Sequence, residues 1–146
     1  MLSPSANQSL EERQVLAPAN EVRAHGGSRR RPKRILVADD NRDAAESCAL
    51  LLRMDGHEVV SACDGASAWD CFQRFEPDVA ILDIAMPSMS GHELARCIRR
   101  SREHRRVLLI AISGWVRASD RDRCFEAGFD HYLAKPVDYE ELNRLL

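Results

Sequence analysis

The sequence has no long apolar segment. None of its apolar runs approaches the ~20 residues that a helix needs to cross a bilayer. The polar amino terminus also lacks the apolar stretch of a secretory signal peptide. We therefore expect a cytoplasmic protein with no membrane span.

The usual patterns of metal, redox and dinucleotide sites are missing as well. The five cysteines are odd in number and include no C-x-x-C pair, so we expect reduced, mostly buried small apolar residues. The five histidines lack the spacing of zinc ligands, which makes a zinc site a poor interpretation. No G-x-G-x-x-G follows the first predicted strand, which argues against a dinucleotide-binding domain. The cysteines are Cys48, Cys63, Cys71, Cys97 and Cys124.

Charge divides the 146 residues into two parts. Residues 1–34 hold seven Lys/Arg and three Glu, a net of +4, whereas residues 35–146 hold fourteen Lys/Arg and twenty Asp/Glu, a net of −6. With little apolar periodicity, residues 1–33 are predicted to be a disordered basic tail or linker. Its basic run could contact nucleic acid or a membrane, although a solvated linker is the favoured interpretation. The acidic remainder, residues 34–146, is long enough for one domain and is a poor nucleic-acid platform.

Short apolar runs alternate with helical patterns from Arg34 onward. This alternation predicts five β–α units, a parallel sheet and helices on both of its faces. Such sheets bind ligands at the carboxyl ends of their strands. The predicted strands are Ile35–Ala38, Glu58–Ala62, Val79–Leu82, Val107–Ile112 and Tyr132–Leu133, and the predicted helices are 42–54, 65–75, 91–100, 119–127 and one from Tyr139.

Two helix signals can be compared directly with a structure. Ser90 and Glu93 have the spacing of a capping box at the start of the third helix. In the first helix an apolar stripe with i, i+4, i+7, i+8 spacing is expected to face the core. The stripe consists of Ala44, Cys48, Leu51 and Leu52.

Polar residues stand at four of the five strand ends. Three are carboxylates, which would repel one another at one edge of the sheet unless a cation joined them, and oxygen ligands favour a hard ion such as Mg²⁺. A carboxylate can also be a nucleophile toward phosphorus, with a hydroxyl and an ammonium to hold the phosphoryl oxygens. Taken singly, the acid pair could be a strand end before a helix cap, and the lysine an ordinary surface residue. The residues are Asp39 and Asp40, Asp83, Ser113 and Lys135, the last being the one lysine among thirteen arginines beyond residue 34.

Four segments in order, "ADD", "LDIAMPSMSGHELA", "SGW" and "YLAKP", resemble the receiver domain of two-component response regulators. The resemblance covers residues 34–146. It implies a flavodoxin-like, doubly wound (βα)5 fold with strand order 2-1-3-4-5. The "SGW" and "GFDHYLAKPVD" segments look more like receivers attached to hybrid histidine kinases than like those fused to DNA-binding modules.

The resemblance also assigns roles to individual residues. Asp83 corresponds to the phosphoacceptor, Ser113 to the switch hydroxyl, Lys135 to the phosphate-binding lysine, and Tyr132 to the aromatic residue that changes rotamer. The Lys135–Pro136 bond corresponds to one that is typically cis. Trp115 is expected at the rim, where it could shield the acyl phosphate or dock a partner. The implied Mg²⁺ ligands are Asp39, Asp40, Asp83 and the backbone carbonyl of Ala85.

The resemblance predicts a phosphoacceptor that takes its phosphoryl group from a histidine kinase or a histidine phosphotransfer protein. It would catalyse only its own phosphorylation and dephosphorylation, and would switch the surface formed by helix 119–127, the strand at Tyr132–Leu133 and the helix from Tyr139. We expect no DNA-binding module after Leu146, where the last helix is short and could be truncated; the downstream partner is unknown. Two alternatives remain open: a phosphorylation-independent binding module and, less well matched, a phosphatase with an Asp nucleophile.

Overall fold

The computed structural model describes residues 31–101, 106–114 and 117–146. Nearly all of the predicted tail, residues 1–30, and the predicted rim residue Trp115 lie outside the described residues. In chain order the elements are β1 (Arg34–Ala38), α2 (Arg42–Met54), β2 (Glu58–Ala62), α3 (Gly65–Phe75), β3 (Val79–Asp83), α4 (Gly91–Arg100), β4 (Leu108–Ser113), α5 (Ala118–Ala127), β5 (His131–Ala134) and α6 (Tyr139–Leu145).

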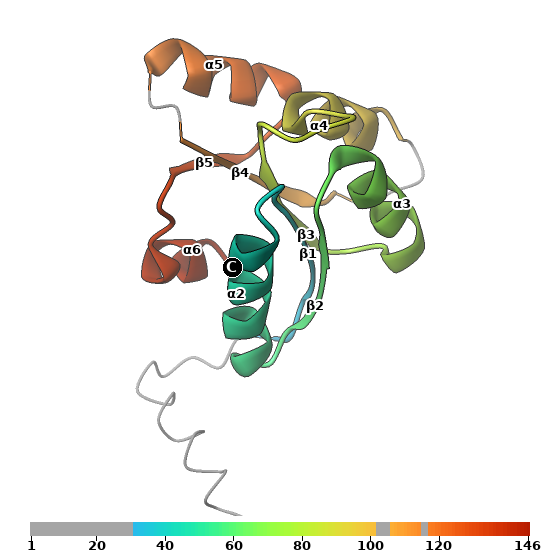
Figure 1. The fold of residues 1–146 in the computed structure, drawn as a ribbon, viewed down its shortest axis with the longest axis vertical. Coiled ribbons are helices and arrows are strands. Elements are labelled where there is room, and N and C mark those ends of the chain that lie inside the picture. The colour runs from blue at the N-terminus through green and yellow to red at the C-terminus, as the bar shows by residue number, and fades with distance from the viewer. Residues whose placement is uncertain (1–30, 102–105, 115–116) are drawn as a thin grey trace, which may run out of the picture. The chain divides into compact units, whose positions relative to one another are not determined.

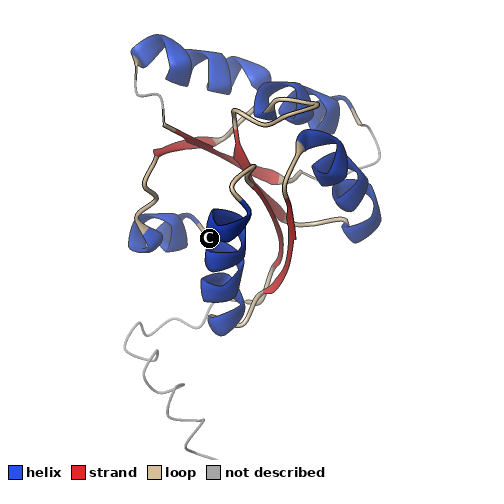
Figure 2. Cartoon of the chain, in the orientation of Figure 1, coloured by secondary structure: helices blue, strands red, loops and turns tan. Residues whose placement is uncertain are grey.

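The five strands form one parallel sheet in the order β2-β1-β3-β4-β5, which confirms the predicted topology. Helices cover both faces (Figures 1 and 2). Successive strand residues point to opposite faces, so Ile35 and Val37 pack with α2 and α6, whereas Leu36 and Ala38 pack with α3, α4 and α5. Because all five strands run parallel, their carboxyl ends lie at the same edge of the sheet.

The predicted apolar stripe of α2 is confirmed at Leu52, which is buried, and is wrong at Ala44 and Leu51, which are exposed. The buried positions are Ala45, Ala49 and Leu52, while Leu51 is 42% exposed. Both registers satisfy an i, i+4, i+7 pattern, so spacing alone could not separate them. Packing against the sheet selects the register with two alanines, whose small side chains suit a close approach of helix and sheet. Leu50 and Met54 are exposed on the outside of α2.

The capping signal predicted for the third helix is confirmed. Ser90 and Glu93 form the complete capping box at the start of α4. Gly128 ends α5 with a φ of 114°, a conformation that glycine adopts without the strain of a Cβ.

The five cysteines are free thiols, as expected, but only Cys124 is buried and the other four are half-buried. None of the described helices is both long enough and apolar enough to cross a membrane.

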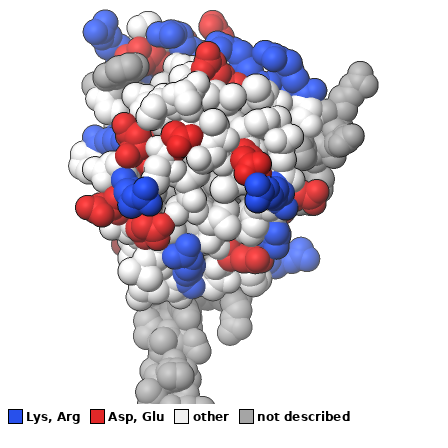
Figure 3. Space-filling view, turned by 45° about the vertical axis from the view of Figure 1, so that its right-hand side comes forward, with Lys and Arg blue, Asp and Glu red and all other residues white. Residues whose placement is uncertain are grey.

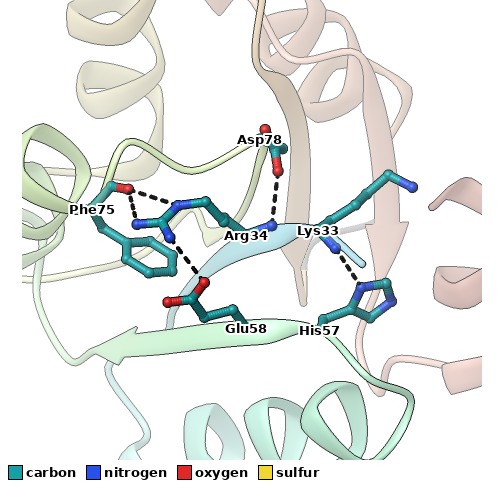
Figure 4. Close-up of polar contacts among 6 residues, drawn as sticks. All are labelled: Lys33, Arg34, His57, Glu58, Phe75 and Asp78. Atoms are coloured by element: carbon teal, nitrogen blue, oxygen red, sulfur yellow. Dashed lines mark hydrogen bonds and ion pairs between the residues drawn. The ribbon is translucent and has the colours of Figure 1, made fainter. Parts of the chain in front are cut away.

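A group of polar contacts ties together the amino ends of the strands (Figure 4). We call it the amino-end network; its residues are Lys33, Arg34, His57, Glu58, Phe75 and Asp78. The Arg34 guanidinium donates to the Phe75 carbonyl and to Glu58, and lies over the Phe75 ring, 4.1 Å from its centroid. The backbone N–H of Arg34 donates to Asp78 at 2.8 Å, and that of Lys33 to His57 Nδ1 at 3.0 Å.

Charged side chains are unevenly spread on the surface. In Figure 3, Lys and Arg side chains gather along the top edge, over α5 and α4, whereas acidic and basic groups alternate lower down. The exposed arginines of this part include Arg96 and Arg100 on α4 and Arg121 and Arg123 on α5.

Candidate phosphoacceptor and metal site

The polar residues predicted at the strand ends lie together at the carboxyl edge of the sheet. Asp39 follows β1, Asp83 ends β3, Ser113 ends β4 and Lys135 follows β5. These strands are neighbours in the sheet, so residues up to 96 positions apart in sequence become adjacent. Asp39, Asp83 and Ser113 are buried, with 4%, 3% and 3% of their surface exposed.

Three carboxylates meet one ammonium at this edge. Asp39, Asp40 and Asp83, which we call the acidic cluster, each offer an oxygen within 4.8 Å of the others. Lys135 Nζ lies 3.1 Å from Asp83 Oδ2 and 3.2 Å from Asp39 Oδ2. The site thus holds three carboxylates and one ammonium, an excess of two negative charges. This excess costs free energy because two of the carboxylates are buried.

The pKa of Asp83 is raised in this environment. Burial is the main reason that its pKa rises to about 6, and the neighbouring charge of Asp39 adds to the rise. The hydrogen bond and charge of Lys135, and the Ala85 N–H at 3.3 Å from Asp83 Oδ1, act in the opposite direction. Burial would lower the pKa of Lys135, but its contacts with Asp83 and Asp39 outweigh burial and raise it.

The donor set suits a hard divalent cation. It consists of carboxylate oxygens, two of them buried, with a surplus of negative charge. Mg²⁺ typically takes one or two carboxylates together with waters and phosphate oxygens. No histidine or cysteine joins this group among the described residues, so the chemistry favours Mg²⁺ over zinc.

Strand β5 carries Tyr132 and leads directly into Lys135. The backbone N–H of Lys135 donates to the Ser113 carbonyl at 2.9 Å, and the Lys135–Pro136 bond is cis, as the resemblance predicted. The Tyr132 ring packs against the core cluster beneath α3, α4 and α5. Its hydroxyl is buried and has no hydrogen-bond partner among the described residues.

The loop after Asp83 is attached to α3 in a way that sequence patterns do not predict. This loop, residues 84–90, contacts the start of α3 through Pro87 and Ser88. Ser88 has a φ of 67°, which is uncommon for a residue other than glycine. Nothing in the local sequence around Ser88 predicts that contact, because the partner helix lies more than twenty residues earlier.

Comparison with known proteins agrees with this geometry. Residues 35–146 match the family model of the response regulator receiver domain. The chain belongs to this receiver family. Receiver domains are signalling modules of two-component systems, and the match accounts for the order in which acids, hydroxyl and lysine follow the strands.

Curated proteins similar to this chain differ in how much of their own length it matches. The response regulator MprA of Mycobacterium sp. (strain KMS) is 38% identical over 111 residues, which cover 76% of this chain and 47% of MprA. The chain thus spans about half the length of the curated relatives it matches first. A 14.6 kDa protein of Leptolyngbya boryana is 35% identical over 112 residues, 77% of this chain and 86% of that protein.

Solved receivers share the fold. A putative response regulator from Chloroflexus aurantiacus is 30% identical with a TM-score of 0.73, covering 79% of this chain and 94% of that one. The receiver of the sensor histidine kinase PA1611 from Pseudomonas aeruginosa is 32% identical with a TM-score of 0.71 and the same coverage. That structure holds a magnesium ion coordinated in its active-site cleft.

Proposed function

We propose that this chain is the phosphoacceptor of a two-component phosphorelay and that Asp83 receives the phosphoryl group. The observation that supports this most is the place of Asp83, buried between the Lys135 ammonium and the other two acids of the acidic cluster. The proposed donor is the phosphohistidine of a histidine kinase or of a histidine phosphotransfer protein. We place the reaction in the cytoplasm, where ATP-dependent kinases make phosphohistidine.

The transfer needs an ionised nucleophile. A pKa of about 6 leaves the Asp83 carboxylate mostly charged at neutral pH. One of its oxygens attacks phosphorus while the P–N bond of the donor breaks, and the bonding electron pair returns to the imidazole nitrogen. The product is an aspartyl phosphate. Lys135, whose Nζ is 3.1 Å from Asp83 Oδ2, is placed to neutralise charge that gathers on the phosphoryl oxygens.

Mg²⁺ is the proposed cofactor, and Asp39, Asp40, Asp83 and the backbone carbonyl of Ala85 are its proposed ligands. When bound, the ion would supply the positive charge that the acidic cluster lacks and would offset the charge of the phosphoryl group. The receiver of PA1611 with its coordinated magnesium supports this assignment by similarity.

The proposed output is a change in the surface formed by α5, β5 and α6. Ser113 would donate to a phosphoryl oxygen, and this new contact, with the ion pair to Lys135, would favour a second packing of that surface. The buried hydroxyl of Tyr132 supports this idea, because an unsatisfied buried donor stores free energy that a rearrangement could release.

Phosphorylation with acetyl phosphate tests the proposal. With Mg²⁺ present, intact-protein mass spectrometry should show the gain of one phosphoryl group, and EDTA should abolish it. Asp83→Asn should remove the gain, whereas Asp78→Asn, at the opposite end of the same strand region, should retain it. Labelling that survives in Asp83→Asn would reject the assignment of the phosphoacceptor.

A further inference from the structure

The loop that follows Asp83 is held by the first turn of another helix. The Gly65 N–H donates to the Pro87 carbonyl at 3.1 Å, and the Ala66 N–H donates to Ser88 Oγ at 3.1 Å. The first N–H groups of a helix have no partner within the helix. Loop 84–90 therefore supplies the acceptors for two of the open amides of α3.

Ser88 contacts α3 next to the N-cap of that helix. Asp64, the N-cap of α3, accepts the Ser67 N–H at 2.8 Å. The pKa of Asp64 lies below its usual value first because of this Ser67 bond, against a small cost of burial, and the Ser88 hydroxyl is among the further donors that lower it. The Ser88 hydroxyl thus joins the loop to the first turn of α3 beside this cap, and Ser88 adopts its φ of 67° at this contact.

Steric contact makes the fit between α3 and the loop tight. A Cβ atom added to Gly65 would overlap the Met89 carbonyl oxygen and would lie 2.5 Å from Met89 Cβ. The obstacle includes backbone, so a side-chain rotation cannot relieve it. Any residue other than glycine at position 65 must therefore push the loop and α3 apart.

The same loop is joined directly to the phosphoacceptor. Its first residues follow Asp83, and the Ala85 N–H donates to Asp83 Oδ1. At its other end, the Gly91 N–H donates to the Ile84 carbonyl at 2.9 Å, and a Cβ on Gly91 would lie 2.5 Å from the Asp83 carbonyl oxygen. The bend at Pro87–Met89 lies two to four residues after Ala85. A displacement of this bend would therefore also move the Ala85 backbone relative to the Asp83 carboxylate.

From these contacts we infer that Gly65 and Ser88 are positioning residues for the phosphorylation site. Together they fix loop 84–90 against α3 and so set the place of Ala85 relative to Asp83. This inference rests on the proposed function, because it assigns to both residues an effect on Mg²⁺ binding and phosphoryl uptake. Neither residue touches the reacting atoms.

Gly65→Ala and Gly56→Ala form a matched pair that tests the inference. Gly56 has a φ of 99° with nothing within 4 Å of an added Cβ, so its replacement strains the backbone far from the acidic cluster. We expect both variants to lose stability in urea melts. Only Gly65→Ala should weaken Mg²⁺ binding, by about tenfold or more in calorimetric titration, since small misplacements at a reacting centre have large effects.

Ser88→Gly and Ser88→Asn keep the test decisive even where Gly65→Ala does not fold. Glycine accepts the positive φ but removes the hydroxyl, so Mg²⁺ affinity and the rate of phosphorylation by acetyl phosphate should fall about two- to tenfold, the usual worth of one hydrogen bond. Asparagine also tolerates this conformation and offers a side-chain oxygen to the Ala66 N–H, so it should restore much of the loss.

The outcomes separate the inference from the proposed function. A wild-type protein that neither binds Mg²⁺ nor gains a phosphoryl group would overturn both. If the wild type does both and Gly65→Ala and Ser88→Gly match it, the proposed function stands and the positioning role is rejected. Equal losses of Mg²⁺ affinity in Gly65→Ala and Gly56→Ala would also reject it, because the effect would then follow stability alone.

Discussion

The two ends of the sheet differ in how their charged side chains are paired. In the amino-end network, the Arg34 guanidinium meets one carboxylate, one carbonyl and one aromatic ring, and the Asp78 carboxylate accepts a backbone N–H. At the carboxyl edge, the acidic cluster holds three carboxylates, and the Lys135 ammonium contacts two of them, Asp39 and Asp83. Partners of opposite character therefore balance at one end, and like charges accumulate at the other.

This difference separates residues that hold the fold from residues that are kept for chemistry. Partnered polar groups contribute to stability, whereas crowded carboxylates reduce it until a cation or proton arrives. Substitutions at the two ends should consequently change stability in opposite directions.

Asp40→Ala should have the largest effect, on ligand binding. It removes one of the proposed ligands, so the Mg²⁺ dissociation constant should rise by about a hundredfold or more, judged against the 10- to 100-fold effects typical of outer-shell groups. Without Mg²⁺, the free energy of unfolding should be unchanged or higher, because a repelling charge is gone. Calorimetric titration and urea melts measure the two effects. Asp43→Ala, an acid in the first turn of α2, is the control and should retain Mg²⁺ binding.

Asp83→Asn should stabilise the metal-free protein. The pKa of Asp83 is about 6 in the folded state against an ordinary 3.8, so the folded state binds more protons between these values. Stability therefore falls as pH rises from about 4 to about 6, and the uncharged variant escapes this loss, gaining about 1–3 kcal/mol at pH 7.

Urea melts in EDTA at several pH values measure this gain. The advantage of Asp83→Asn should shrink as the pH is lowered toward about 4, where the wild-type carboxyl is protonated as well. Saturating Mg²⁺ should stabilise the wild type and narrow the difference. A variant less stable than the wild type at pH 7 would contradict the cost assigned to the buried charge of Asp83.

Arg34→Ala should act in the opposite direction at the amino end. It removes the bonds to the Phe75 carbonyl and Glu58 and the stacking on the Phe75 ring, and should cost about 1–2 kcal/mol of unfolding free energy. Arg74→Ala is the control, since Arg74 pairs with Asp70 on the surface of α3, where such pairs contribute about 0.3–0.5 kcal/mol. Equal losses in the two variants would show that the network adds nothing beyond an ordinary surface ion pair.

The sequence predicts the residues at the carboxyl edge better than it predicts the packing of helices and loops. The convergence of Asp39, Asp83, Ser113 and Lys135 follows from topology, because strands of a parallel sheet end at a common edge. The register of α2 does not follow, since Ala44 and Ala45 begin equally good apolar stripes and only packing chooses between them. The contact of Gly65 with Met89 is also beyond sequence patterns, because it joins residues of different β–α units through backbone atoms.

The smallest expected effect concerns the two tyrosines, which make a natural pair. The Tyr132 hydroxyl is buried without a partner among the described residues, whereas the Tyr139 hydroxyl donates to Asp55 at 2.8 Å. Tyr132→Phe should therefore raise the free energy of unfolding by up to about 1 kcal/mol, and Tyr139→Phe should lower it by about 0.5–1.5 kcal/mol. Urea melts of both variants beside the wild type measure the difference.

The same pair examines the proposed switch. If phosphorylation gives the Tyr132 hydroxyl a partner, Tyr132→Phe loses the contact that favours the phosphorylated packing, while Tyr139→Phe keeps it. Beryllofluoride, which mimics the phosphoryl group, should then shift amide NMR signals of α5, β5 and α6 in the wild type and in Tyr139→Phe, and shift them less in Tyr132→Phe. Full shifts in Tyr132→Phe would remove this hydroxyl from the switch. Shifts confined to residues beside Asp83 in the wild type would instead favour a passive phosphate relay, since a modification moves a conformational equilibrium only through contacts that differ between its two states.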